Sequence, residues 1–299
     1  MVRRSVVVVV AALTVVVLAA VPASATWSII AVDSQTGEVG AAMAACSPVS
    51  ALGEPDEVPA PLVLVPGRGV AVAQGSVDPG DLDQLRAALS DPDTGGADDV
   101  IVAVVADNDP DLQSVRQYAA VVDGSVASID GPQTKPIALA VTGPAVAAQG
   151  VSLASEAVVV DALAAYNEVR AGGASLADAL VSALEAGSSA GGDRGCGDQT
   201  ALFAHVSVAP PGDDGIAPSR LLTVTVDEGD GQNPVRLLVE AHREGRTGWI
   251  NAGLRSPTTL PRWLVLVVGV SMAVASVLVI RRGMGYRRPR AANHHPGSR

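Results

Sequence analysis

Short apolar runs of strand length occur at both ends of the central part of the sequence, and longer helical patterns lie mainly between them. The run "TWSIIAVD" alternates, "SQTGE" is typical of a turn, and "VGAAMAA" is a second run, which together predict a hairpin over residues 26–45. Another hairpin is predicted at Asp123-Gly124 within "QYAAVVDGSVASID". This order of elements predicts an α+β fold with antiparallel sheets, because a doubly wound fold would alternate strands with helices throughout.

The remaining elements follow from the same patterns of apolar residues. Strands are predicted at "LVLV" (62–65), "GVAVAQG" (69–75), "DDVIVAVVAD" (98–107), "AVAAQG" (145–150), "QTALFAHVSVA" (199–209) and "RLLTVTVD" (220–227). Helices are predicted at "DPGDLDQLRAALS" (78–90), "LASEAVVVDALAAYNEVR" (153–170), "SLADALVSALEAG" (175–187) and "NPVRLLVEAHREG" (233–245).

Residues 1–25 have the pattern of a targeting segment. A basic start, "MVRR", is followed by a long apolar run and then by "PASA", with small residues at Ala23 and Ala25. This order is typical of a secretory signal peptide. We expect cleavage after Ala25, which would make Thr26 the first residue of the mature chain; cleavage after Ala23 is the alternative.

A second apolar segment, residues 263–280, contains no charged residue. A membrane crossing needs about 20 apolar residues, so we expect one transmembrane helix here. Arginines are concentrated in the tail that follows, 281–299, and a basic flank marks the cytoplasmic side of a membrane. The sequence therefore predicts an ectodomain over 26–245, a linker over 246–262 and a single-pass protein of the cell membrane with a cytoplasmic C-terminus.

The expected ectodomain is strongly acidic. All 31 Asp and Glu residues lie from Asp33 to Glu244, whereas nine of the 20 Lys and Arg residues lie within 1–25 and 261–299. A surface of this sign repels nucleic acid, so we expect no nucleic-acid partner. Neither a dinucleotide-binding glycine motif nor a metal-spaced His or Cys cluster occurs in the sequence, and we expect no cofactor and no metal.

The two cysteines, Cys46 and Cys196, both lie in the expected ectodomain. Outside the cytoplasm an even number of cysteines favours a disulfide. A catalytic thiol is the alternative, but no Cys-His pairing is visible in the sequence. His205 and His242 lie within a predicted strand and a predicted helix, which favours structural roles for both over a Ser-His-Asp triad.

Thr26 would combine a nucleophile and a base in one residue if it begins the mature chain. A free α-amino group has a pKa of about 8, so a substantial neutral fraction exists around neutral pH and can take the proton of the hydroxyl. The alternative is that Thr26 is one of the small polar residues with which many exported proteins begin. Position alone favours this alternative.

The Gly-rich segment "AGGDRGCGDQTAL", residues 190–202, links a predicted helix to a predicted strand. Glycines let the backbone adopt unusual angles and approach other groups closely. Asp193, Arg194 and Gln199 supply an acid, a base and an amide that could orient a substrate. A simple helix-to-strand turn with solvated charges is the alternative.

Five stretches occur in the order seen in one protein family: "TWSIIAVDSQTGEVGAAMA", "GVAVAQG", "YAAVVDGSVASIDG", "AVAAQGVSLASEAV" and "AGGDRGCGDQTAL". The chain resembles an uncharacterised family, a domain of unknown function, of the N-terminal-nucleophile (Ntn) hydrolase superfamily. In cytosolic members the pattern begins Met-Thr-Phe-Ser-Ile, and removal of the initiator Met would expose the Thr. Here Trp27 replaces Phe, and export processing replaces Met removal. The resemblance covers almost all of residues 26–245 and implies a four-layer αββα sandwich.

The resemblance implies that Thr26 is the catalytic nucleophile. The candidates for the groups that bind the substrate or an oxyanion are Gln74, Gln149, Gly150, Asp193, Arg194 and Gln199. The chain departs from the family pattern in the Gly-rich loop, which has an insertion around Cys196, lacks a second Arg and has Thr200 where Ser is usual. It also has Val151-Ser152-Leu153 where the family has Asn-Met-Leu.

Two functional hypotheses follow. In the first, an exported, membrane-anchored Ntn-hydrolase-like protein hydrolyses an amide bond in a small amide or peptide-like substrate from the cell envelope. Thr26 is the nucleophile and its own amine is the base; Lys135, the one lysine of the expected ectodomain, lies in a predicted loop, so a lysine-assisted mechanism is not expected. In the second, the same scaffold is not catalytic and binds a cell-envelope peptide or a partner protein.

Overall fold

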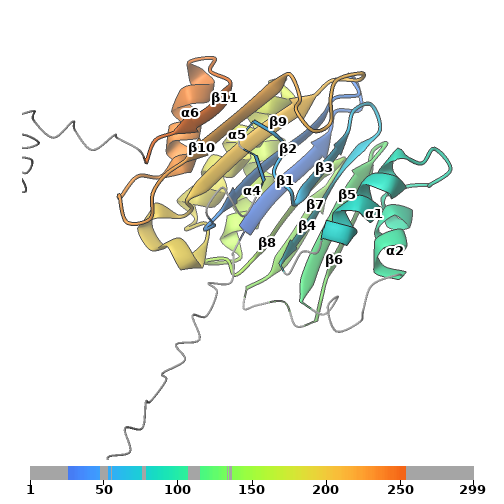
Figure 1. Cartoon of the computed structure of the whole chain (residues 1–299), viewed down its shortest axis with the longest axis horizontal. Helices are drawn as coiled ribbons and strands as arrows, with labels where there is room; N and C mark the ends of the chain where they lie inside the picture. The colour runs from blue at the N-terminus through green and yellow to red at the C-terminus, as the bar shows by residue number, and fades with distance from the viewer. Residues whose placement is uncertain are drawn as a thin grey trace, which may run out of the picture. The chain divides into compact units, whose positions relative to one another are not determined.

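The described strands form two β-sheets that pack face to face (Figure 1). The computed structural model describes residues 26–47, 53–54, 56–75, 79–106, 115–132, 134 and 137–253. The larger sheet contains, in spatial order, β11 (Gly248–Asn251), β10 (Arg220–Thr225), β9 (Phe203–Ala209), β2 (Val39–Ala45), β1 (Thr26–Val32), β8 (Val146–Val151) and β7 (Leu139–Gly143). The smaller sheet contains β3 (Leu62–Val65), β4 (Gly69–Gly75), β5 (Arg116–Val122) and β6 (Ser125–Asp130).

Both predicted hairpins are confirmed. β1 and β2 pair in antiparallel fashion, with Thr26 opposite Ala45. β5 and β6 pair around a turn at Asp123 and Gly124, which have φ angles of 48° and 87°. Positive φ at both central residues is what a two-residue hairpin turn of type I′ requires. Among the described strands, β10 and β11 are parallel and the other pairs are antiparallel.

Helices cover the outer faces of both sheets, which confirms a mixed α+β fold. The described helices are α1 (Pro79–Ser90), α2 (Ala97–Ala106), α4 (Ala157–Ala171), α5 (Leu176–Ser189), the 3₁₀ helix η2 (Arg194–Gln199) and α6 (Pro234–Arg243). One apolar cluster joins α4, α5 and α6 to the larger sheet, a second lies between the sheets, and a third joins the smaller sheet to α1 and α2. The described elements therefore stack in the order helices, sheet, sheet, helices (Figure 1).

One predicted strand is wrong, because residues 98–106 of the "DDVIVAVVAD" stretch lie in helix α2. Val100, Ile101 and Val104 are buried, whereas Val102 is 62% exposed, so burial follows the helical period and not the alternation of a strand. Asp98 and Asp99 lie in the first turn, where acidic side chains stabilise a helix. The run of β-branched residues favoured a strand, but packing against α1 and the smaller sheet decides the structure.

Two strands at the margins of the larger sheet were not predicted. β7 lies at one edge, and β11 at the other pairs in parallel with β10. β11 falls in the stretch expected to be a linker, so the folded part extends beyond residue 245. Both strands have five residues or fewer, which is too short for a clear alternation of apolar and polar side chains.

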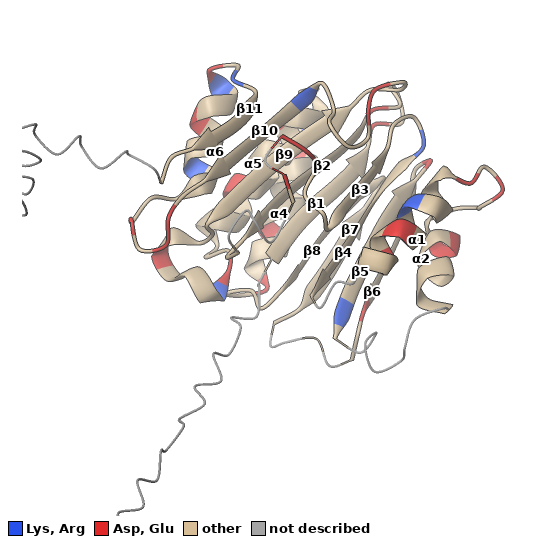
Figure 2. Cartoon of the chain, in the orientation of Figure 1, with Lys and Arg blue, Asp and Glu red and all other residues tan. Residues whose placement is uncertain are grey.

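The expected targeting segments, 1–25 and 263–280, the tail and Lys135 lie outside the described residues, so these predictions stay untested. None of the helices in the described part of the chain has the length and apolar character that a membrane crossing requires. Figure 2 shows that acidic residues in this part lie mostly on helices, loops and strand ends, while the facing strands are almost free of charged residues.

Two glycines make room for Trp27, the second residue of the central strand β1. Its indole is fully buried on the helical side of the larger sheet. A Cβ on Gly187 of α5 would lie 2.7 Å from Trp27 Nε1, and a Cβ on Gly192 would lie 2.7 Å from its Cη2. Contacts this short do not occur between real side chains, so both positions require glycine for packing.

The replacement Gly187→Ala tests this packing. The added methyl group would meet the Trp27 indole and the Val158 carbonyl oxygen, at 2.7 and 3.0 Å. Overpacking costs about 1–3 kcal/mol, and replacing a helical glycine by alanine returns about 1 kcal/mol. We therefore expect the free energy of unfolding, measured by urea denaturation, to fall by up to about 2 kcal/mol.

A double-mutant cycle identifies the source of that loss. Trp27→Phe removes the Nε1 atom, so Gly187→Ala should cost less in the Trp27→Phe background than in the wild type. An equal cost in both backgrounds would contradict the proposed contact.

Candidate functional site

Thr26 is the first residue of β1, between β2 and β8, where it pairs with Ala45 on one side and Val151 on the other. Side chains alternate along a strand. Ile30 belongs to the cluster between the sheets, whereas Trp27 belongs to the cluster on the helical side. Thr26 is an even number of residues from Ile30, so its buried side chain faces the space between the sheets.

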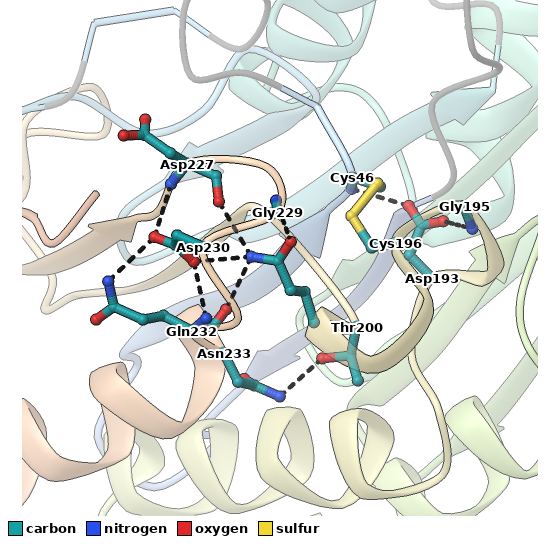
Figure 3. The surroundings of a disulfide bond; sticks show 11 residues. Cys46, Asp193, Gly195, Cys196, Thr200, Asp227, Gly229, Asp230, Gln232 and Asn233 are labelled. Atoms are coloured by element: carbon teal, nitrogen blue, oxygen red, sulfur yellow. Dashed lines mark hydrogen bonds between the residues drawn. A yellow bond between two sulfur atoms is a disulfide. The ribbon is translucent and has the colours of Figure 1, made fainter. Parts of the chain in front are cut away.

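Asp193 lies beside this end of β1. Its fully buried carboxylate accepts hydrogen bonds from two backbone N–H groups, that of Cys46 at 2.8 Å and that of Gly195 at 2.7 Å. Cys46, whose N–H points to the Asp193 carboxylate in Figure 3, follows Ala45, the partner of Thr26. Leu153, two residues beyond the other partner, forms a β-bridge with Asp193. Both neighbours of β1 therefore lead directly to contacts with Asp193.

Burial raises the pKa of Asp193 to about 6, although the N–H groups of Gly195 and Cys46 lower it in part. The neighbouring Arg194 is exposed, and no ion pair joins it to Asp193 in the part of the chain that the structure describes. A carboxyl group with a pKa close to neutrality, held at a strand end, is typical of functional sites.

Two residues that contact the Asp193 segment have strained backbones. Ser152 and Thr200 have φ angles of 54° and 61°, which residues with a Cβ rarely adopt. The Ser152 carbonyl accepts the Arg194 N–H at 3.2 Å, and the Thr200 carbonyl accepts the Asp193 N–H at 2.9 Å. Backbone strain of this kind costs about 1–3 kcal/mol per residue and concentrates at functional sites.

A disulfide between Cys46 and Cys196 fixes the same segment to the end of β2 (Figure 3). The two Cα atoms are 5.6 Å apart, and 150 residues separate the cysteines in sequence. Closing a loop of this length contributes about 5 kcal/mol in the chain-entropy model. The disulfide and the hydrogen bond to Asp193 both hold the 193–196 segment to Cys46, the residue that follows β2.

A layer of polar side chains crosses the space between the sheets next to Thr26. The Ser28 hydroxyl donates to Gln74, the Gln74 amide donates to Gln117, and the Gln117 amide donates to Asp130. Gln149 lies opposite Ser28 and is fully buried, yet neither its Nε2 nor its Oε1 has a hydrogen-bond partner within the described residues. Each unpaired buried group costs about 1–3 kcal/mol.

The structure therefore brings Thr26, Gln74, Gln149 and Asp193 to one end of the two sheets. Ser28, Gln117 and Asp130 were missed by sequence analysis. The available signal was a polar residue in an otherwise apolar strand, as at Gln117 in "RQYAAVV" and at Ser28 two positions after Thr26.

Three other predicted residues have different surroundings. Gly150 follows Gln149 and faces the helical side, where a Cβ would lie 2.4 Å from Leu153. Arg194 is exposed. Gln199 uses its amide to hold the 227–232 loop: it donates to Asp227, Asp230 and Gln232 and accepts from the Gly229 N–H.

Neither described histidine reaches Thr26. His205 on β9 is fully buried, its Nδ1 lies 2.9 Å from the Thr223 hydroxyl, and burial lowers its pKa to about 3, so it is neutral. In the register of the sheet, Met43 separates it from Ser28. His242 on α6 pairs with Asp178 at 2.8 Å. In the described residues, no three His, Cys, Asp or Glu side chains come together in a way that could hold a metal.

A protein-family model matches residues 26–238, and its description is "Family of unknown function (DUF1028)". The chain belongs to this family. The match begins at Thr26, the first residue of β1. DUF1028 assigns no activity, and no curated protein matches the chain.

A solved structure has the same fold. The chain is similar to the crystal structure of protein SPO2555 from Silicibacter pomeroyi, which is described with the same DUF1028 model. The TM-score is 0.56 and the sequence identity 22%, over 75% of this chain and 87% of that chain.

Asp193 should make stability depend on pH. Its pKa of about 6 in the folded protein exceeds the value of about 3.9 expected after unfolding. Its contribution is thus fully present below about pH 4 and is lost as pH rises through about 6, by an amount on the order of 2–3 kcal/mol.

Denaturation measured across this range checks the expected loss. Asp193→Asn should flatten the decline between about pH 4 and pH 6, since asparagine does not ionise. The pKa values of Asp33, Asp178 and Asp213 are lowered. Their contributions to the stability of the fold are therefore lost only toward more acidic pH, and they do not produce a loss of stability as the pH rises. A decline that is the same in the variant would contradict the assignment.

Proposed function

We propose that this protein is an exported, membrane-anchored amide hydrolase of the Ntn type, with Thr26 as its catalytic nucleophile. The observation that carries the proposal is the position of Thr26. It follows a signal-peptide pattern, begins the family domain, and starts the central strand with its side chain turned between the sheets. The stacking of helices, sheet, sheet and helices is the arrangement that resemblance to the Ntn superfamily implies.

The reaction needs one residue to supply two functions. The Thr26 hydroxyl oxygen attacks the amide carbon, and the α-amino group takes the hydroxyl proton. The carbon–nitrogen bond then breaks, the proton passes to the departing amine, and an ester of Thr26 forms. Water attacks this ester with the same amine as base and releases the acid. The absence of a histidine next to Thr26 among the described residues is compatible with a base carried by Thr26 itself.

Asp193 and the polar layer have separate roles in this proposal. Asp193 holds the ends of β2 and β8 around Thr26 through backbone groups. Gln149 faces the space between the sheets with its amide unpaired and provides polar groups for the substrate, and Gln74, whose amide is bonded to Ser28 and Gln117, faces the same space. Export and a C-terminal anchor would place the site outside the cytoplasm, where a small amide or peptide-like component of the cell envelope is the proposed substrate.

Covalent labelling tests the nucleophile. A small β-lactone opens when a hydroxyl attacks it, so one equivalent should add to the peptide that begins with Thr26, as read by intact and peptide mass. Thr26→Val keeps the shape of the side chain and should abolish labelling, while Thr26→Ser should retain it. One extra alanine before Thr26 should reduce the labelling rate by about 10²–10⁴, because it removes the free amine that acts as base.

A matched threonine provides the control. Thr36 is exposed in the turn between β1 and β2, and Thr36→Val should leave labelling unchanged. Thr26→Val removes one buried hydroxyl at nearly constant shape and should change the free energy of unfolding by no more than about 1.5 kcal/mol, so chemistry and folding separate. Labelling that persists in Thr26→Val would overturn the proposal. A mature chain that begins at Thr26 but does not label would favour the binding function on the same scaffold.

A further inference from the structure

Gln149 is the unusual member of the polar layer. Other buried side chains with an unpaired polar atom in the described residues, such as His205 and Trp27, leave one atom unpaired, whereas Gln149 leaves both ends of its amide without a partner. Buried polar groups are almost always paired, so an entire unpaired amide requires an explanation. Because both ends are unpaired, exchanging the oxygen and nitrogen assignments of the amide changes nothing.

The neighbouring polar groups have no amide end left over for Gln149. The Asp130 carboxylate can only accept when it is ionised, so Gln117 must donate to it, and Gln117 then accepts from Gln74. Gln74 in turn accepts from the Ser28 hydroxyl. This chain of hydrogen bonds runs in one direction, from Ser28 to the exposed Asp130, and it bypasses Gln149.

The site lies close to a common end of four strands. β1 begins at Thr26, β8 ends at Val151, β5 begins at Arg116, and β4 ends at the exposed Gly75. Gln149 is two residues from the end of β8 and pairs with Ser28, two residues from the start of β1. A substrate group next to the bond that Thr26 attacks would therefore need to extend only two residues along β1, from Thr26 to Ser28, to meet Gln149.

We propose that Gln149 determines specificity by binding an uncharged carboxamide, or another amide in the cis form, of the substrate. A planar amide with a free N–H and a free carbonyl is complementary to another such amide through two antiparallel hydrogen bonds. A carboxylate offers no donor to Oε1 and would add negative charge to a buried layer that already ends at Asp130. The inference rests on the proposed function, because it places the substrate beside Thr26.

The amide of Gln149 has no contact with solvent in the free protein. An entering group must therefore separate the strand ends, and a required conformational change lowers the association rate constant. A slow, saturable step should accompany binding of an amide.

Binding can be measured without the reaction. The full mature chain in detergent, as wild type and as Thr26→Val, is titrated with propionamide and with its isosteric control propionate, and the side-chain amide resonance of Gln149 is followed by NMR. We expect propionamide to shift this resonance saturably in both proteins, and propionate to bind at least about 100-fold more weakly.

Two variants complete the test. Gln149→Leu removes the amide at similar size, and Gln149→Glu replaces its donor by an acceptor. In both, the preference for propionamide, read from shifts of backbone resonances in β1, should fall at least about tenfold. A β-lactone bearing a carboxamide should label wild type faster than its carboxylate analogue, and this difference should disappear in Gln149→Leu.

The outcomes separate the two proposals. If propionamide binds at Gln149 but no β-lactone labels Thr26, the carboxamide site stands and the hydrolase proposal fails. If Thr26 labels while both variants keep the wild-type preference, the role of Gln149 is wrong. Equal binding of propionamide and propionate, or no response of the Gln149 resonance to either, would also overturn it.

Discussion

The two hydrogen bonds that the buried Asp193 carboxylate accepts hold the end of the molecule at which Thr26 lies. One comes from the residue that follows β2 and the other from its own turn. The backbone N–H groups of Asp193 and Arg194 donate hydrogen bonds to the carbonyl oxygens of Thr200 and Ser152. Three segments far apart in sequence are thus fixed around the start of β1, and the disulfide between Cys46 and Cys196 adds a covalent link at the same place. The negative charge of Asp193 is stabilised by the backbone N–H groups of Gly195 and Cys46. No cation among the described residues contributes to this stabilisation.

Sequence patterns predicted the strands of the two hairpins well. β1, β2, β5 and β6 have clear apolar runs joined by recognisable turns, so local patterns and the final pairing agree. The prediction of a strand in place of α2 was wrong. Val100, Ile101, Val102 and their neighbours favour a strand locally, while contacts with α1 and the smaller sheet require a helix. Those contacts join residues distant in sequence, and no window of the sequence contains them.

The candidate site could be predicted only in part, for a similar reason. Thr26 and Asp193 were found because a cleavage pattern precedes one and a glycine-rich loop surrounds the other. Gln117 and Asp130 were missed, since only the pairing of β4, β5 and β6 brings them next to Gln74. Gln199 was predicted to bind substrate, but its amide is occupied by the 227–232 loop, a contact between segments about 30 residues apart.

Glycine in the 190–202 segment is required both by backbone conformation and by packing against Trp27. Sequence alone offered backbone freedom as the reason for the glycines of this segment. Gly192 has a φ of 54°, and a side chain there would also collide with Trp27. The segment therefore packs against the residue next to Thr26 in sequence, while its Asp193 reaches the residue next to Ala45, the strand partner of Thr26. The position of Thr26 and the conformation of the loop are coupled through these contacts.

The central claim is that Thr26 acts with its own free amine, and the N-terminus of the mature protein tests it most directly. The chain is isolated from the membranes of the organism that makes it, and its first residues are determined by N-terminal sequencing and intact mass. If Thr26 acts with its own amine, we expect a single N-terminus, Thr26-Trp27-Ser28, with an unmodified amine. A mature chain that begins at Ser24, retains the 1–25 segment or carries a blocked threonine would contradict it.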